Sequence, residues 1–327
     1  MTVRRVVLRT LALAITVALV AWLVADARWQ GVGARLARLW RDHAAALAGV
    51  AALFAASYAM RGARIFGEFR SELERARGAD TGAAGRSYLR ILRLTLVHNA
   101  LVNVLPFRSG EVAFPVLLNR WFGVGTGRAI VSLLWLRCQD AAVVLVLAAL
   151  VWPRLPGACR VVAVLAIVAA AVAVPAWARH RTTAAAPSSS AVGPKLQALL
   201  GRATERAASG WGWTVGNWTV KLAAEAWLVA LALAPGPELS GGGDAILGAI
   251  GAELPSILPI QGVAGFGTFE AGAAALMRTN GVALATGLEA ALALHAVVLG
   301  LAVAAGALGA WLLPGPTAVA AAPTPTS

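Results

Sequence analysis

The sequence predicts an all-α protein that crosses a membrane several times, as a polytopic bundle of about six full spans and two re-entrant hairpins made of broken helices. Hydrophobic residues make up 59% of the 327 residues and charged residues only 13%, against roughly 25% in soluble domains. Such a chain cannot cover a globular surface with polar groups, and it is too apolar for disorder. Its two cysteines, Cys138 and Cys159, form neither a disulfide framework nor a zinc site by themselves.

Membrane topology explains the net charge of +13 better than nucleic acid does. The basic residues lie beside apolar runs, where they set orientation and meet anionic lipid headgroups. The sequence contains no stripe of alternating aromatic and basic residues and no known nucleic-acid module. We therefore expect membrane lipids, and not nucleic acid, as partners.

Six apolar runs predict the full spans. They are residues 11–25, 44–60, 129–152, 161–177, 213–234 and 288–313. The first run could instead belong to a signal peptide, because Ala25-Asp26-Ala27 resembles a cleavage site and Arg4-Arg5 resembles a twin-arginine signal. The apolar character of the whole chain favours a first transmembrane helix with a cytoplasmic N-terminus.

Polar segments separate these runs. Eight arginines interleaved with acids follow the second run and predict a solvated loop or surface helix: Arg61, Arg64, Arg70, Arg75, Arg77, Arg86, Arg90 and Arg93. Residues 314–327, rich in alanine, proline and threonine, predict a disordered tail. We expect one transmembrane domain over residues 1–313, with halves at about 1–178 and 179–313.

An unusual element occurs twice. Residues 92–105 and 245–258 are short apolar helices, each followed by a break rich in Pro and Gly and then by a second short helix, 112–122 or 268–277. Irregular backbone at membrane depth is tolerated only where protein or a water-filled cavity satisfies it. Paired broken helices in two halves indicate a transporter-like binding site. The alternative is two tight turns between ordinary short helices.

The distribution of basic residues predicts the orientation. With six spans and two re-entrant hairpins, eighteen basic residues fall on the cytoplasmic side and seven outside, as the positive-inside rule requires when the N-terminus is cytoplasmic. The first hairpin then enters from the cytoplasm and the second from outside, which is the arrangement of an inverted repeat.

Three pairs of opposite charge lie inside apolar or broken segments: Arg108 with Glu111, Arg137 with Asp140, and Lys221 with Glu225. Spacings of three and four place the partners of the last two pairs on one helix face. Ionisable groups inside a membrane are costly and usually functional. The pairs indicate either a polar cavity within the bundle or ion pairs that only fix helix packing.

The two breaks supply the other candidate residues. Glu111 and Glu270 follow the breaks near helix N-termini. One interpretation is a simple favourable interaction of each acid with the helix dipole. The other is a site in which free backbone N–H groups at these helix N-termini hold a phosphate, with Arg108 as a charged partner. The candidate substrate-binding residues are Asn99, Asn103, Pro106, Arg108, Gly110, Glu111, Arg137, Asp140, Lys221, Glu225, Pro259, Gly262, Gly265, Gly267 and Glu270.

The sequence shows no motif for catalysis or for a cofactor. Its four histidines are scattered without metal-ligand spacing, and no nucleophile-elbow or nucleotide-binding fingerprint occurs. We expect no metal, no cofactor and no enzymatic activity. Without an ATP motif, transport would be passive or ion-coupled.

The first break carries a resemblance to a family. Asn103-Val104-Leu105-Pro106-Phe107-Arg108-Ser109-Gly110-Glu111 resembles the N-x-L-P-G-R-x-G-E signature of the flippase-like membrane proteins, also called the lysylphosphatidylglycerol synthetase transmembrane region. Pro259 through Glu270 resembles the second signature, and the hydropathy fits over about residues 6–313. Phe107 replaces a usual glycine, Gln261-Gly262-Val263-Ala264 replaces a Pro-Gly-Gly run, and the element ending at Asp140 lacks a usual glutamate.

The resemblance implies the membrane half of fused lysyl-lipid enzymes, without the soluble aminoacyl-transferase domain. It implies a translocase of the inner membrane for an anionic phospholipid or a polyprenyl-phosphate-linked sugar, bound by its headgroup between the broken helices. Arg108 and Lys221 would neutralise phosphate, while Glu111, Asp140 and Glu270 would order the site. The alternatives are a membrane enzyme acting on lipid-linked sugars and a membrane partner of a separate synthase.

Overall fold

A computed structural model describes residues 28–77, 84–184, 207–233, 242–257 and 263–314. Several predicted features lie outside these residues: the first span 11–25, the tail from residue 315, and Pro259 and Gly262 of the second break. The described part of the chain contains helices and no strand, which confirms the prediction of a helical membrane bundle.

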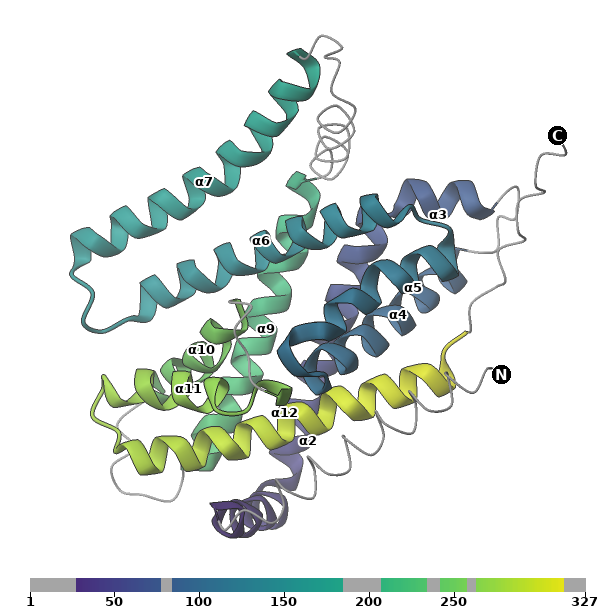
Figure 1. Ribbon diagram of the computed structural model, residues 1–327. Coiled ribbons are helices and arrows are strands. Elements are labelled where there is room, and N and C mark those ends of the chain that lie inside the picture. The colour runs from purple at the N-terminus through teal and green to yellow at the C-terminus, as the bar shows by residue number, and fades with distance from the viewer. Residues whose placement is uncertain (1–27, 78–83, 185–206, 234–241, 258–262, 315–327) are drawn as a thin grey trace, which may run out of the picture. The chain divides into compact units, whose positions relative to one another are not determined.

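Figure 1 shows the helices of the described residues in chain order. They are α2 (Arg28–Glu68), α3 (Arg70–Arg77), α4 (Ala84–Val104), the 3₁₀ helix η2 (Pro106–Val112), α5 (Ala113–Phe122), α6 (Thr126–Val151), α7 (Gly157–Ala184), α9 (Ala207–Leu233), α10 (Gly243–Ile257), the 3₁₀ helix η3 (Val263–Gly265), α11 (Thr268–Arg278) and α12 (Leu284–Leu312).

The chain divides into two compact units, Met1–Leu47 and Ala48–Ser327. In the first unit the structure describes only the beginning of α2, whose backbone leaves the helical conformation at His43. All the helices from α3 onward, and the part of α2 after Leu47, belong to the second unit. The site described below lies wholly in this second unit.

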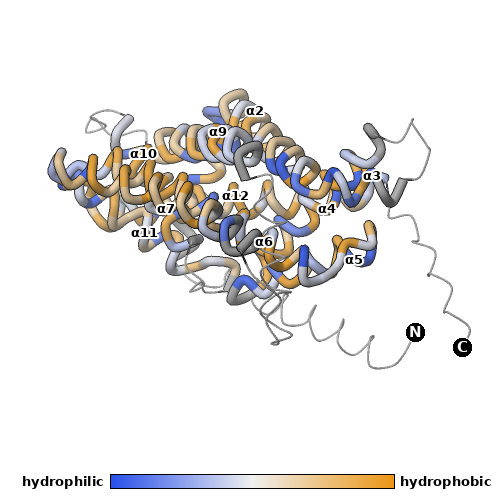
Figure 2. Tube along the Cα trace, turned by 90° about the horizontal axis from the view of Figure 1, so that it is seen from above, coloured by the Kyte–Doolittle hydropathy of each residue, from blue (hydrophilic) through white to orange (hydrophobic). Residues whose placement is uncertain are grey.

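Four helices are long and apolar enough to cross a membrane among the described residues. The spans are Gly33–Glu68, Thr126–Val151, Gly157–Val174 and Leu284–Leu312. Figure 2 shows apolar residues along most of the length of the helices. The helix α9 is also long, but its hydropathy is lowered by Asn217, Lys221 and Glu225, and it is not among the four.

The outer helix α7 packs on α6 and exposes a large apolar surface. Val161, Val162 and Leu165 are each more than half exposed, and none of the span Gly157–Val174 is buried inside the protein. Lipid tails are as apolar as these side chains. The exposure of α7 is therefore what a lipid-facing helix requires.

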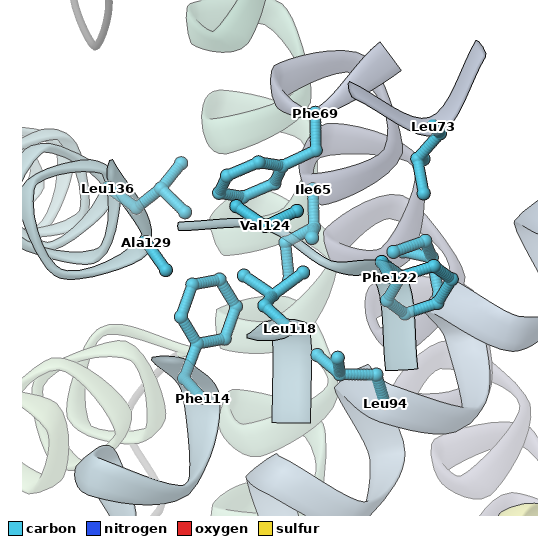
Figure 3. Packing of buried hydrophobic residues seen from close by; sticks show 11 residues of the cluster. Ile65, Phe69, Leu73, Leu94, Phe114, Leu118, Phe122, Val124, Ala129 and Leu136 are labelled. Carbon is cyan, nitrogen blue, oxygen red and sulfur yellow. The ribbon is translucent and has the colours of Figure 1, made fainter. Parts of the chain in front are cut away.

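A cluster of aromatic and aliphatic side chains joins the end of α2 to α3, α4, α5 and α6 (Figure 3). Ile65, Phe69 and Leu73 recur at intervals of four and lie on one helical face, because backbone hydrogen bonds continue from Ile65 to Leu73 across the bend between α2 and α3. They pack against Phe114 and Leu118 of α5. This packing fixes the first broken element beside α2.

Close packing of small residues holds the second broken element. A Cβ atom built on Gly251 of α10 would overlap the backbone of Gly272 in α11, so the two helices approach to backbone contact. The helix α12 packs on α11 and also along α4, where a Cβ atom built on Gly306 would overlap Ala100 Cβ. Small residues permit such approaches between membrane helices.

Both predicted breaks are confirmed. The first is the 3₁₀ helix η2, between the end of α4 and the start of α5, and the second carries left-handed backbone at Ala264, Gly265 and Gly267 before α11 begins. The helix before the first break is longer than predicted, because α4 continues through the arginines that precede residue 92. The segments η2 and η3 contact each other.

The prediction of a solvated segment after residue 60 is wrong at its beginning. The helix α2 continues to Glu68, and Arg64 is only 4% exposed. The reason is a partner that lies far along the chain, since Arg64 Nη1 donates to Asp140 Oδ1 of α6 at 2.7 Å. Arg61 likewise lies within α2, where it faces Asn99 of α4.

Candidate functional site

A cavity of about 440 Å³ lies where the two breaks meet. Its wall contains Arg108 and Glu111 of η2 together with Ala264 and Gly265 of η3. The remaining wall comes from α2, α4, α6, α9, α10, α11 and α12. The irregular backbone of both halves therefore faces one shared polar space, as a binding site between broken helices requires.

Glu111 is the centre of the first break. Its Oε1 atom lies 2.7 Å from Arg108 Nη2 and 2.7 Å from Arg137 Nη2, and its Oε2 atom lies 3.4 Å from His98 Nε2. The carboxylate thus joins η2 to α4 and α6. Its negative charge is met by two guanidinium groups, which it holds at the cavity wall.

The backbone of η2 depends on a glycine. A Cβ atom at Gly110 would overlap the backbone of Leu101 and Val102 in α4. The break therefore folds back against the helix that precedes it, and this contact is open only to a residue without a side chain. Arg108, with φ of 54°, takes the left-handed conformation that this close turn requires.

Asp140 is the second carboxylate of the cavity wall. Its Oδ1 atom accepts from Arg64 Nη1 at 2.7 Å and from Trp218 Nε1 at 3.0 Å, while Oδ2 accepts from Arg137 Nη1 at 3.2 Å. Arg64 also donates to Leu136 O and to Gln139 Oε1. Asp140 thereby ties α2, α6 and α9 together.

Arg64 separates this cavity from a second one. The second cavity, of about 550 Å³, is lined by Arg64, Glu68, Trp135 and Gln139 among others, whereas Asp140 lines the first. The Arg64–Asp140 ion pair therefore forms part of the wall between two polar spaces. Both side chains are more than nine-tenths buried.

Lys221 is the third charged centre. Its Nζ atom lies 2.7 Å from Glu253 Oε1 of α10 and 3.3 Å from Glu225 Oε1 on its own helix, and it lies over the ring of Trp218 at 4.9 Å. Lys221 and Glu253 line the cavity, whereas Glu225 is fully buried behind them.

The second break is held by a buried histidine. Glu270 Oε2 accepts from the backbone N–H of Gly267 at 2.7 Å, and its Oε1 atom lies 2.5 Å from His295 Nδ1 of α12. His295 Nε2 donates to Ala264 O at 3.0 Å, and the imidazole lies against the rings of Phe266 and Phe269. The two ends of the turn are thus bound by Glu270 and His295, and these two side chains contact each other.

One cation of the cavity wall forms no ion pair with a described residue. Arg61 Nη1 donates to Asn99 Oδ1 at 2.9 Å, and no carboxylate among the described residues lies within 4.0 Å of its guanidinium. Arg108, Arg137 and Lys221 each lie in an ion pair. The wall therefore carries a positive group that is available to an anion.

Residues 9–306 match the family described as the lysylphosphatidylglycerol synthase TM region. The chain belongs to this family. The match covers nearly the whole chain and includes both breaks and every charged centre described above. The family suggests a multi-pass membrane protein involved in lipid modification or translocation. Neither the curated protein sequences nor the solved structures contain a match to the chain.

For this member of the family, the structure brings eight of the sequence-predicted residues to one cavity. They are Asn99, Asn103, Arg108, Glu111, Arg137, Asp140, Lys221 and Gly265. Four others lie just behind its wall, because they support a lining residue or the turn itself: Gly110, Glu225, Gly267 and Glu270. Pro106 begins η2.

Four residues of the site were not predicted from the sequence. Arg61, Glu253 and His295 line the cavity, and His98 contacts the lining residue Glu111. Glu253 and His295 lie in apolar runs, and an ionisable residue in such a run is itself a signal of function. Arg61 gave no such signal, because it begins a run of arginines that resembles a solvated segment. Within the described residues, no group of three or more His, Cys, Asp or Glu could hold a metal ion.

Proposed function

We propose that the protein translocates a lipid with an anionic headgroup across the membrane, with the headgroup in the cavity between the two breaks. The observation that carries this proposal is Arg61, a cation of the cavity wall whose guanidinium has no carboxylate within 4.0 Å among the described residues. An arginine fork matches the geometry of a phosphate. The substrate class is an anionic phospholipid or a polyprenyl-phosphate-linked sugar.

The other cations support this role. Arg108 and Arg137 are oriented by Glu111, and Lys221 by Glu253, so their positions are fixed before a ligand enters. A preorganised site loses less side-chain entropy on binding. Three cations held in place by ion pairs, and one cation without an ion pair, together favour a headgroup with a net negative charge over a zwitterionic headgroup.

Translocation requires the headgroup to reach both sides of the membrane. In the proposed cycle, the half containing α4, η2 and α5 rocks against the half containing α10, η3 and α11. The Arg64–Asp140 pair, which lies between the two cavities, opens and closes the polar path. The acyl tails stay in the bilayer throughout, and the N-terminus is cytoplasmic in the inner membrane.

The test is a translocation assay with headgroup-labelled phosphatidylglycerol in proteoliposomes. Arg61→Gln removes the charge and keeps a polar side chain, so we expect the rate to fall by about tenfold or more, as loss of a charge-assisted hydrogen bond implies. Arg120→Gln, at an exposed position in the last turn of α5, is the matched control and should retain the wild-type rate. Equal rates for wild type and Arg61→Gln would contradict the proposal.

The proposed activity is transport without chemistry on the lipid. After translocation, mass spectrometry of the recovered phosphatidylglycerol should show only the starting compound. A modified lipid formed by the purified protein, and not formed by Glu111→Gln, would instead identify a membrane enzyme.

A further inference from the structure

Glu225 is a buried acid whose carboxyl group lacks hydrogen-bond partners among the described residues. Its side chain has no exposed area, and neither carboxyl oxygen has a hydrogen-bond partner among the described residues. The nearest cation is Lys221, whose Nζ atom lies 3.3 Å from Oε1. Burying a carboxylate without hydrogen bonds is costly. An ionised carboxylate at this position therefore requires a further hydrogen-bond donor or a proton to offset the cost of burial.

A second carboxyl faces the first. Glu253 of α10 shares Lys221 with Glu225: Nζ lies 2.7 Å from Glu253 Oε1 and 3.3 Å from Glu225 Oε1, so the two carboxyl groups flank one ammonium. Two ionised carboxylates cannot bond to each other, because neither carries a hydrogen. Two acids with one ammonium also leave an excess of one negative charge in a buried place. One proton removes both defects.

Among the described residues, no cation other than Lys221 lies within 4.0 Å of the carboxyl group of Glu225 or Glu253. On α2, Tyr58 is near Glu225, and Arg61 interacts with Lys221 and Tyr58. On the other two helices that pack on α9, Asp140 of α6 is paired with Arg64, and His295 of α12 is paired with Glu270.

The same face of α9 carries another incomplete polar group. Asn217 lies four residues before Lys221, and its Oδ1 atom accepts from Ser57 Oγ at 2.7 Å. Its Nδ2 atom is buried and has no hydrogen-bond partner among the described residues. Asn217, Lys221 and Glu225 recur at intervals of four, so they form one polar stripe that faces α2 and α10.

We propose that Glu225 and Glu253 bind one proton between them, and that this proton crosses the membrane together with each anionic headgroup. The coupling runs through Lys221, which lines the cavity on one side and neutralises the two acids on the other. A phosphate that draws the ammonium into the cavity leaves more negative charge on the acids, so they hold the proton more tightly. By linkage, the proton favours phosphate binding to the same extent. The coupling rests on the proposed lipid transport, whereas the proton site does not.

The proton site is tested by infrared spectroscopy of the protein in nanodiscs of phosphatidylcholine. We expect the carbonyl band of a buried, protonated carboxyl group at neutral pH. Glu225→Gln and Glu253→Gln should each abolish it, because a single acid beside Lys221 is fully neutralised by the ammonium. Glu74→Gln, at an exposed carboxylate paired with Arg70, should leave the band unchanged. Absence of the band in the wild type, or its survival in both variants, overturns the site.

The coupling is tested in proteoliposomes that contain labelled phosphatidylglycerol. With one proton per lipid, a gradient of about one pH unit should drive the labelled lipid toward the alkaline side by about tenfold, and Glu225→Gln should abolish this accumulation. Translocation that ignores the pH gradient, or that follows a sodium gradient instead, overturns the coupling while leaving lipid transport in place. A wild type that moves no lipid but shows the carbonyl band contradicts the proposed function and supports the proton site.

Discussion

At the scale of single residues, each break is organised by one carboxylate. Glu111 is bound by two arginines at 2.7 Å, and Glu270 is bound by His295 and by the backbone of Gly267. The two acids differ in what they position. Glu111 holds cations at the cavity wall, whereas Glu270 fixes the turn that precedes α11. Only the first arrangement offers charge directly to a ligand.

Gly110 carries a tight steric requirement within the first break. We expect Gly110→Ala to destabilise the protein by about 1–3 kcal/mol, because the new methyl group must displace the backbone of Leu101 and Val102. Thermal unfolding in detergent measures this effect. The matched control is Gly212→Ala in α9, where a Cβ atom meets nothing within 4 Å, and where alanine should be neutral or slightly stabilising. Equal unfolding temperatures for the two variants would show that η2 does not pack on α4 as described.

Local residue patterns explain which parts of the site could be predicted. The pairs Arg108–Glu111, Arg137–Asp140 and Lys221–Glu225 are three or four residues apart, and all three occur as ion pairs. Partners that come from distant helices leave no such pattern. Arg64 meets Asp140 across 76 residues, so an arginine that resembles a solvated residue proves to be buried.

At the scale of elements, small residues determine how closely the helices approach. The breaks could be predicted because Pro and Gly occur together in apolar surroundings, but the contact between η2 and η3 could not, since it depends on how α4 and α12 pack. Among the glycines of α12, Gly306 lies closest to α4, with an added Cβ atom at 2.5 Å from Ala100 Cβ.

Two glycines of α12 give a matched test of that packing. Gly306→Ala should destabilise the protein by about 1–3 kcal/mol, because Ala100 Cβ and Leu96 O occupy the space of the added methyl group. Gly300→Ala, on the same helix with nothing within 4 Å, should have no destabilising effect. Denaturation of both variants in one detergent measures the difference, and a larger loss for Gly300→Ala would disprove the contact between α4 and α12.

The helix α3 is held to α6 by charge. Burial by itself would raise the pKa of Glu72, but hydrogen bonds, including one from Ser71, and the charge of Arg128 at 3.2 Å hold the pKa below its ordinary value of 4.5. A lowered carboxyl pKa in the folded state stabilises that state above the ordinary pKa, and the stabilisation is lost as the pH falls through the lowered value.

Acid should therefore loosen α3. We expect proteolysis of the segment Arg70–Arg77 to accelerate as the pH falls below about 4.5, and we expect Glu72→Gln to be cleaved faster already at neutral pH, with a weaker dependence on acid. An acid-stable protease measures both rates. Cleavage of the wild type that does not change on acidification would contradict the role of the Glu72–Arg128 pair.

At the scale of the whole molecule, the polar groups of the second unit gather where its two broken elements meet. Composition predicts a membrane bundle because 59% of the residues are hydrophobic, and two breaks with similar chemistry predict a site between halves. The identity of the available cation could not be predicted, because it depends on which arginine of the cavity wall lies without an ion pair to a described residue after folding. In the cavity wall that residue is Arg61, which faces Asn99 inside the bundle.

The proposed binding of an anionic headgroup between the breaks depends on Arg61. The most direct measurement is an experimental density map of the protein in nanodiscs that contain phosphatidylglycerol. We expect phosphate density within hydrogen-bond distance of the Arg61 guanidinium, in the cavity between η2 and η3, and the loss of that density in Arg61→Gln. Headgroup density only outside the cavity, with Arg61 still bonded to Asn99 alone, would contradict it.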